Sequence, residues 1–116
     1  MKILFLGVGE RKPPIEMTME SSLSAVGRLM NARELKQTTF YCFGKPFCVF
    51  YDGDRLSQPP IVSVFSSRDG RMLVGNIVIT GAEDNEGRFS DLTDEDIESL
   101  RSCCMLSCGY YFLLLK

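Results

Sequence analysis

Residues 38–51 have the sequence TTFYCFGKPFCVFY, in which two runs of aromatic and β-branched residues flank Gly44-Lys45-Pro46. Such runs on either side of a glycine and proline turn predict a β-hairpin. A three-residue loop would place Cys42 opposite Cys48 on the two strands. We therefore expect an antiparallel sheet built around this hairpin.

The segments before the hairpin predict two more strands and a helix. Residues 3–8 are apolar and rich in β-formers, which indicates a buried strand, and residues 15–20 alternate apolar and polar side chains, which indicates a strand with one solvated face. We expect these two strands to pair antiparallel. Ser21 or Ser22 can cap a short amphipathic helix over residues 23–30, where apolar residues recur at helical spacing.

The segments after the hairpin predict a second hairpin, a second helix and a last strand. Residues 61–65 and 72–80 flank a turn at residues 68–70, and the apolar tail at residues 110–115 is typical of a final strand. With a helix near residues 91–100, the chain is predicted to be α+β: a mainly antiparallel sheet of five to seven strands with two helices packed on one face.

Composition limits the possible functions. The chain has 116 residues, 45% of them hydrophobic, which suits a single globular domain over residues 1–116. It contains no histidine. Serine and cysteine triads, most neutral-pH general bases and most catalytic zinc sites need an imidazole. Catalysis by carboxylates, a lysine, a thiolate or electrostatic stabilisation is the alternative that composition leaves open. We expect a protein that is not an enzyme and has no cofactor.

The stretch from Glu83 to Glu98 is strongly acidic, although the net charge of the whole chain is only −2. A helix start explains part of it, because carboxylates are favoured at a helix N-terminus, and Thr93 and Asp96 have capping-box spacing. The alternative is a contact surface for a basic partner or an imitation of nucleic-acid phosphate. Its candidate partner-binding residues are Glu83, Asp84, Glu86, Asp91, Asp94, Glu95 and Asp96. On this hypothesis, reversing residues 94–96 to lysine weakens binding without unfolding the domain.

Five cysteines form an odd set, and the N-terminal apolar run is too short for an export signal. We expect reduced thiols, a cytoplasmic location and no membrane segment, since residues 110–115 cannot span a bilayer. Buried core thiols are the simplest interpretation. A thiol-ligated zinc site is an alternative, with Cys104 and Cys108 on one helical face and Cys42 and Cys48 across the hairpin.

Basic residues offer two further alternatives. Lys36, Arg68 and Arg71 could neutralise the phosphate of a nucleotide or another small anionic ligand. Together with Lys45, Arg55 and the hairpin aromatics, they could also hold single-stranded nucleic acid by stacking. The chain has no RNP-like motif, so nucleic acid is the less favoured partner.

Residues 75–81 (GNIVITG) and 83–97 (EDNEGRFSDLTDEDI) form a recognisable pattern. In it, a strand that ends in glycine leads through an acidic loop to a Phe-x-x-Leu-[Ser/Thr]-Asp-Glu helix start. This pattern resembles the C-terminal half of the family called domain of unknown function 3846, mainly over residues 72–100. The hairpin at residues 39–51 and the extension at residues 103–116 have no counterpart in the family pattern.

The resemblance implies a small accessory protein of a phage or conjugative element, of a kind that accompanies antirestriction proteins. It supplies no catalytic residues. We therefore expect a non-enzymatic protein that binds a host protein, and the resemblance extends this expectation to an inhibitor of a defence system such as restriction or CRISPR. The acidic residues and exposed hairpin aromatics would make the contact. Exposed strand edges, together with the apolar tail at residues 110–115, could also support a homodimer through edge pairing.

Overall fold

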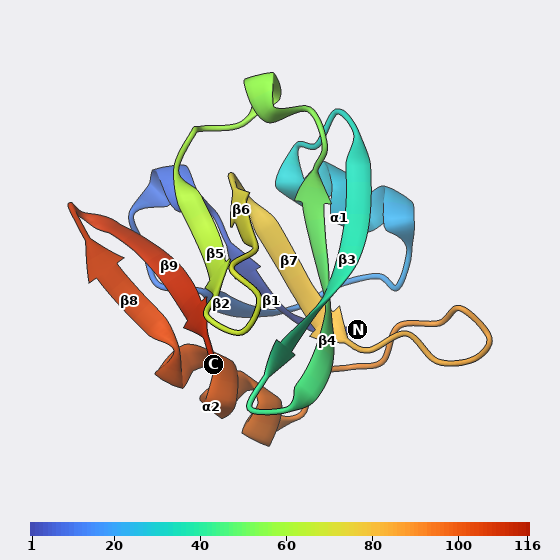
Figure 1. Cartoon of the computed structure of the whole chain (residues 1–116). Coiled ribbons are helices and arrows are strands. Elements are labelled where there is room, and N and C mark those ends of the chain that lie inside the picture. Colours follow the sequence, from blue (N-terminus) through green and yellow to red (C-terminus); the bar gives the residue numbers. More distant parts are fainter.

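Two β-sheets face each other in the structure, a computed structural model that describes residues 1–116 apart from the side chain of Arg55 (Figure 1). The first sheet has the strand order β2 (Ile15–Thr18), β1 (Lys2–Leu6), β7 (Ile77–Gly81), β4 (Lys45–Asp52) and β3 (Leu35–Cys42). All neighbours in it are antiparallel. The predicted pairing of the two N-terminal strands and the predicted β3–β4 hairpin are confirmed.

The second sheet has the strand order β6 (Met72–Val74), β5 (Val62–Ser66), β9 (Tyr110–Leu115) and β8 (Cys104–Ser107). Strands β5 and β9 run parallel, whereas the other two pairs are antiparallel. The second predicted hairpin is confirmed for β5 and β6. After β6 the chain bends at Gly75, which has a φ of +84°, and then enters the first sheet as β7.

The two α-helices lie in different places. Helix α1 (Leu23–Met30) packs on the face of the first sheet that points away from the second sheet, and α2 (Asp94–Ser102) closes one end of the space between the sheets (Figure 1). Two 3₁₀ turns, η1 (Val8–Glu10) and η2 (Arg55–Ser57), lie in connections. The predicted α+β class is confirmed. The expectation that both helices share one face is wrong, because the second sheet occupies the other face.

Local sequence signals set the helix starts as predicted. The Ser22 hydroxyl accepts a hydrogen bond from the backbone N–H of Ala25 at 3.1 Å and caps α1. At α2, Thr93 and Asp96 form the predicted capping box, in which each side chain accepts from the other residue's backbone N–H.

The first sheet is buried on both faces because its central strands are apolar on both. In β1, Ile3 and Phe5 point toward α1, whereas Leu4 and Leu6 point toward the second sheet. Every residue of β7 is buried. The second sheet contributes its inward residues Val64, Leu113 and Leu115 to the core between the sheets. Each such large side chain stabilises the fold by about 1.5–3 kcal/mol when it is fully buried.

The register of the β3–β4 hairpin differs from the prediction. Its loop has two residues, Phe43 and Gly44, with φ values of +51° and +80°, and Cys42 pairs with Lys45. Two-residue turns with positive φ are favoured because their twist matches that of the strands they join. Cys48 consequently lies opposite Thr39. Cys42 belongs to the core between the sheets and Cys48 to the core under α1, so the two thiols lie on opposite faces.

Alanine substitutions at two glycines should change the free energy of unfolding in opposite directions. At Gly81, an added Cβ would lie 2.8 Å from the carbonyl oxygen of Ser90, so Gly81→Ala should lower the free energy of unfolding by about 1–3 kcal/mol. At Gly27 in α1, the nearest atom to an added Cβ is 3.9 Å away, on Leu35. Gly27→Ala should therefore raise stability by about 0.5–1 kcal/mol through helix propensity. Urea denaturation measures both values, and changes of equal sign would contradict the packing described for these sites.

Candidate functional site

The outer face of the second sheet is apolar. Strand alternation points one set of side chains into the core and the other set away from it, as at Phe65 between buried Val64 and Ser66. Cross-strand pairing places Met72 beside Phe65 and Met105 beside Phe112 on the same side. We call this the outer face. It comprises Phe65, Met72, Met105, Tyr110, Phe112 and Leu114.

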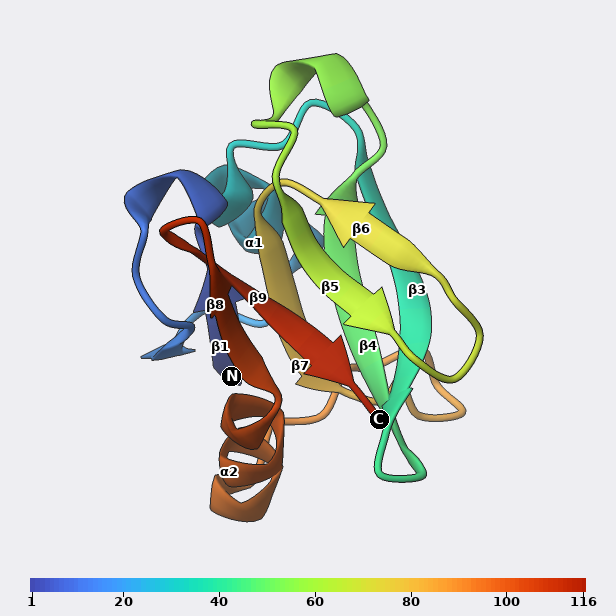
Figure 2. The same cartoon turned by 60° about the vertical axis from the view of Figure 1, so that its left-hand side comes forward.

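No charged side chain belongs to this set, and the set lies over four adjacent strands. Figure 2 shows the second sheet in front of the first, with this face toward the viewer. Met72 is 57% exposed and Phe65 36%. A shallow hollow of about 480 Å³ runs across the face, lined among others by Val62, Phe65, Tyr110 and Phe112. Contiguous exposed apolar patches of this kind mark interaction surfaces in soluble proteins.

One basic side chain adjoins the outer face. The guanidinium of Arg11 lies 4.8 Å from the centre of the Tyr110 ring and donates a hydrogen bond to the Tyr110 hydroxyl at 3.0 Å. The hydroxyl of Tyr110 is thereby held at the border of the face, with its ring on the apolar side. The outer face therefore has a polar end next to an apolar centre.

The seven acidic candidates are divided between two places. Glu83, Asp84 and Glu86 belong to the loop after β7, which projects from the molecule away from α2 (Figure 1). Asp84 organises this loop by accepting from the backbone N–H groups of Glu86 and Arg88 at 2.9 Å. Glu86 also forms an ion pair with Arg88. Asp84 and Glu86 thus have local structural roles, whereas Glu83 accepts a hydrogen bond from the Gln37 amide of β3 at 3.3 Å.

Two of the four candidate carboxylates near α2, Asp94 and Asp96, form ion pairs with lysines from β1 and β4. Asp91 accepts from the backbone N–H of Lys2, and Asp94 forms an ion pair with its ammonium group. Asp96 is 6% exposed at its side chain and pairs with Lys45. Burial raises the pKa of Asp96, but the hydrogen bonds from Lys45 and Thr93 outweigh it and lower the pKa overall. Reversing Asp96 would therefore remove a buried carboxylate that caps α2 and pairs with the half-exposed Lys45, and would put a second cation beside that lysine, contrary to the expectation that residues 94–96 can be reversed without unfolding.

An exposed aromatic does lie beside the remaining acidic residues. Phe43, at the hairpin tip, is 60% exposed and lines a hollow of about 350 Å³ together with Glu95, Glu98 and Ser99 of α2. The predicted contact surface of exposed hairpin aromatics and an acidic helix is therefore small. It contains one exposed aromatic side chain, Phe43, whereas the outer face has six apolar residues.

The three basic ligand candidates do not converge on one site. Arg71 ties the β5–β6 turn to β3: it donates to Asp69 at 2.8 Å and to the Thr39 carbonyl at 2.7 Å, and lies 4.2 Å from the Phe40 ring centre. The Arg68 guanidinium lies over Tyr41. The side chain of Arg55, named with the nucleic-acid alternative, lies outside the described residues.

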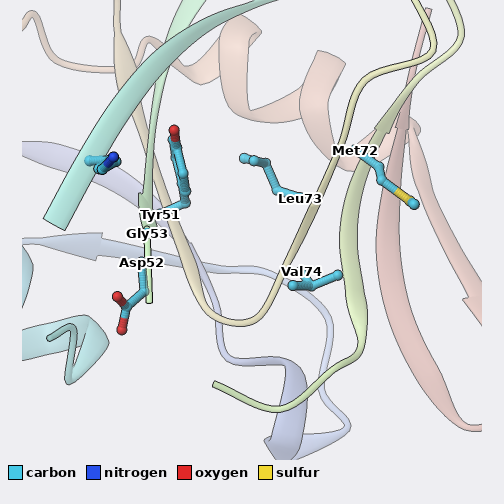
Figure 3. Close-up of a pocket in the computed structure, with 7 residues that line it drawn as sticks. Tyr51, Asp52, Gly53, Met72, Leu73 and Val74 are labelled. Carbon is cyan, nitrogen blue, oxygen red and sulfur yellow. The ribbon is translucent and has the colours of Figure 1, made fainter. Parts of the chain in front are cut away.

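Lys36 lines a pocket of about 270 Å³ between the β3–β4 pair and β6, and it forms an ion pair with Glu34 at 3.4 Å. In Figure 3 the side chains of Tyr51 and Asp52 point in opposite directions, with Tyr51 on the side of Leu73. Among the residues described by the structure, the pocket thus offers Lys36 as its cation, and Lys36 already has a partner. This arrangement does not favour the anionic-ligand alternative.

Asp52 is a buried structural carboxylate. Five donors bind it at 2.6 to 3.2 Å: the backbone N–H groups of Arg33, Glu34 and Asp54, the Ser57 hydroxyl and the Gln58 amide. Burial raises its pKa, but these hydrogen bonds outweigh burial and hold the pKa well below its usual value. The carboxylate fixes the connections that follow α1 and β4.

The cysteines are not arranged as a metal site. Helix α2 ends at Ser102, so Cys104 begins β8 and Cys108 lies in the turn to β9, contrary to the prediction that they share a helical face. Among the described residues, no group of three or more cysteine, aspartate or glutamate side chains is placed to hold a metal ion. Cys42 instead lies 3.6 Å, sulfur to sulfur, from Cys103.

Burial makes these thiols unreactive. Desolvation, together with the Cys103 thiol, raises the pKa of Cys42 to about 12, and desolvation raises the pKa of Cys48 to about 11. Neutral thiols are poor nucleophiles and poor metal ligands. The interpretation of core thiols is therefore the better one for these two cysteines.

The outer face was not among the sequence-predicted sites. Its sequence signal was the unbroken apolar run at residues 110–115, which is apolar on both strand faces, next to the two-residue turn Cys108-Gly109, in which both residues have positive φ. None of the helices in the described part of the chain has the length and apolar composition needed to cross a bilayer. No protein-family profile matches the chain, and comparisons with curated proteins and with solved structures likewise find no match.

Replacing Asp52 should destabilise the protein in a pH-dependent way. At neutral pH, Asp52→Asn should lower the free energy of unfolding by about 2–3 kcal/mol, because buried donors lose a charged acceptor. The folded-state pKa lies below the unfolded value of about 3.9, so this contribution is present above that pH and is lost as the pH falls. The difference between wild type and variant in urea denaturation should shrink in acid. Asp94→Asn, at a 91% exposed carboxyl group, is the matched control, and an equal effect there would contradict the assignment.

The thiols should differ in reactivity. N-ethylmaleimide should modify Cys108 first in the folded protein, because it is the exposed cysteine, whereas Cys42, Cys48 and Cys103 are buried. Peptide mass spectrometry over time measures the order. Cys108→Ser should remove the fast step, and rapid labelling of Cys42 or Cys48 without denaturant would contradict the burial described here.

Proposed function

We propose that this protein is a non-enzymatic binding module that holds a partner protein on the outer face of its second sheet. The observation that carries the proposal is the apolar character of this face. The first sheet has α1 on one side and the second sheet on the other, so its apolar residues are needed for folding. Neither α1 nor α2 packs against the outer face, and in the part of the chain that the structure describes the face lies outside both cores, so folding gives no reason for its large apolar side chains.

The chemistry of the face suits a protein surface better than nucleic acid. Phe65, Tyr110 and Phe112 supply aromatic contact area, and Met72 and Met105 supply adaptable side chains around them. Nucleic acid would need several cations at the rim to neutralise phosphates. Arg11 is the cation that contacts the face through Tyr110. We therefore propose a partner with an apolar patch that has a carboxylate positioned to meet Arg11.

Several features support a role without catalysis. The chain contains no histidine, the Cys42 and Cys48 thiols are protonated at neutral pH, and Asp52 is saturated with donors. These groups do not supply a general base or a nucleophile at an accessible site. Binding without chemical change is the function that fits these side chains.

The resemblance to domain of unknown function 3846 extends the proposal to an origin and a compartment. It supports a product of a phage or other mobile element that acts in the cytoplasm on a host protein. Blocking a defence system such as restriction or CRISPR is an activity of this kind, since occupying a surface is sufficient to inhibit an enzyme complex.

Site-directed variants test the outer face. Phe65→Ser combined with Met72→Ser removes two paired, partly exposed side chains of the face. Proteins captured from host extract by wild type should be lost with this variant, and the binding should then be reproduced with the purified partner. We expect affinity to fall at least tenfold, because burying one such side chain contributes about 1.5–3 kcal/mol.

Variants at the hairpin tip are the matched controls. Phe43→Ser changes a phenylalanine outside the face that is more exposed than Phe65, and Glu95→Lys with Glu98→Lys changes the acidic hollow beside it. Both should bind the partner as wild type does. If only these control variants lost binding, the partner would contact the hairpin tip and α2 instead of the outer face, and the proposal would be wrong. Equal binding of the Phe65 and Met72 variant to the purified partner, or binding of wild type only to lipid vesicles or single-stranded DNA, would contradict the proposal.

A further inference from the structure

Strand β8 is an exposed edge without the usual protection against pairing. Its sequence, Cys-Met-Leu-Ser, contains neither charge nor proline, and it pairs with β9 alone in the second sheet. The Leu106 side chain is 60% exposed and Met105 is 46% exposed. An edge that combines unpaired backbone groups with apolar side chains is a template for another strand.

The other three edges of the two sheets carry features that hinder pairing. Edge β2 has Glu16 at its second position, in an ion pair with Lys2, and edge β3 carries the charged Lys36. Edge β6 is only three residues long, and Arg71 next to it bonds across to β3. Short edges and charged edge residues are known devices against edge-to-edge association. The contrast points to β8 as the edge that is left open.

Hydrogen-bond alternation determines which β8 groups face outward. The two-residue turn at Cys108-Gly109 makes Ser107 and Tyr110 a hydrogen-bonded pair, so Met105 and Phe112 form the next such pair along the ladder. The backbone N–H and C=O groups of Cys104 and Leu106 therefore point away from β9. Cys104 and Leu106, whose backbone groups point outward, are therefore placed symmetrically on either side of Met105.

We propose that β8 pairs antiparallel with β8 of a second copy of this chain, about a two-fold axis at Met105. In this register Cys104 exchanges two backbone hydrogen bonds with Leu106 of the second copy, and Leu106 does the same with Cys104. Met105 faces Met105, and no charge is buried. Every outward backbone group of Cys104 and Leu106 obtains a partner, which is the condition for a self-complementary interface.

The pairing joins the two second sheets into one continuous sheet. Met105 belongs to the outer face, so the outer faces of the two copies become one apolar surface across the axis. The inference is independent of the proposed function, because it concerns the edge and not what covers the face. The apolar tail at residues 110–115 is itself not an edge, since it forms β9 and lies between β5 and β8.

Sedimentation equilibrium under reducing conditions tests the pairing. The edge contact is small, so we expect a monomer–dimer equilibrium within the micromolar to millimolar range. Leu106→Lys should weaken the dimer at least tenfold, because it places a charged lysine on the apolar edge of each copy, opposite Cys104 of the other copy, and charged edge residues hinder strand pairing. Leu56→Lys, at a 98% exposed leucine away from β8, is the matched control and should dimerise as wild type does. Wild type that stays monomeric throughout this range would overturn the proposal.

A cross-link tests the register and does not depend on the folding of Leu106→Lys. In a Cys108→Ser background, Met105→Cys should form an intermolecular disulfide when glutathione disulfide oxidises the two facing thiols and is itself reduced to two glutathione molecules. Leu56→Cys in the same background should stay monomeric on non-reducing gels. Equal cross-linking of the two variants would overturn the pairing. A second result would also overturn the pairing. If Phe65→Ser with Met72→Ser abolished the dimer and Leu106→Lys did not, the two copies would associate through their outer faces and not through β8.

Discussion

Burial of the first sheet on both faces is the constraint on which the rest of the structure depends. Strands β1, β7 and β4 have apolar side chains on both sides, so the sheet needs a cover on each face. Helix α1 is the cover on one side, and with eight residues it spans only part of a sheet. The chain uses its remaining length to build a second sheet on the other side, and α2 closes the end of the core between them.

This constraint separates side chains that serve folding from those that do not. The inner residues of the second sheet, such as Val64 and Leu113, are fully buried in the core. Their neighbours Phe65 and Phe112 point to the opposite side, where a solvated sheet normally carries polar residues. The fold therefore does not require the outer face to be apolar. A surface feature that the fold does not need is the place to look for function.

Local signals in the sequence predicted a large part of the fold. The caps at Ser22 and Thr93, the strand alternation near residue 15 and the hairpin at residues 38–51 each depend on neighbours within a few positions. The second sheet was not predicted, because β5 and β9 pair in parallel across almost fifty residues, and no local pattern specifies such a pairing. The hairpin register was wrong because Phe43-Gly44 forms the turn, with phenylalanine in a conformation that favours glycine or asparagine.

The candidate site was harder to predict than the fold, for the same physical reason. The acidic residues attract attention in the sequence, but their partners Lys2 and Lys45 come from distant strands. Once these ion pairs form, much of the acidic run is explained by turns, caps and pairing. The outer face is the opposite case, because its residues are ordinary apolar side chains in the sequence. Only the parallel pairing of β5 and β9 brings Phe65, Phe112 and Leu114 together on one side of the sheet. The same pairing places β9 inside the sheet and leaves β8 at its edge, so one tertiary contact creates both the apolar surface and the open strand beside it.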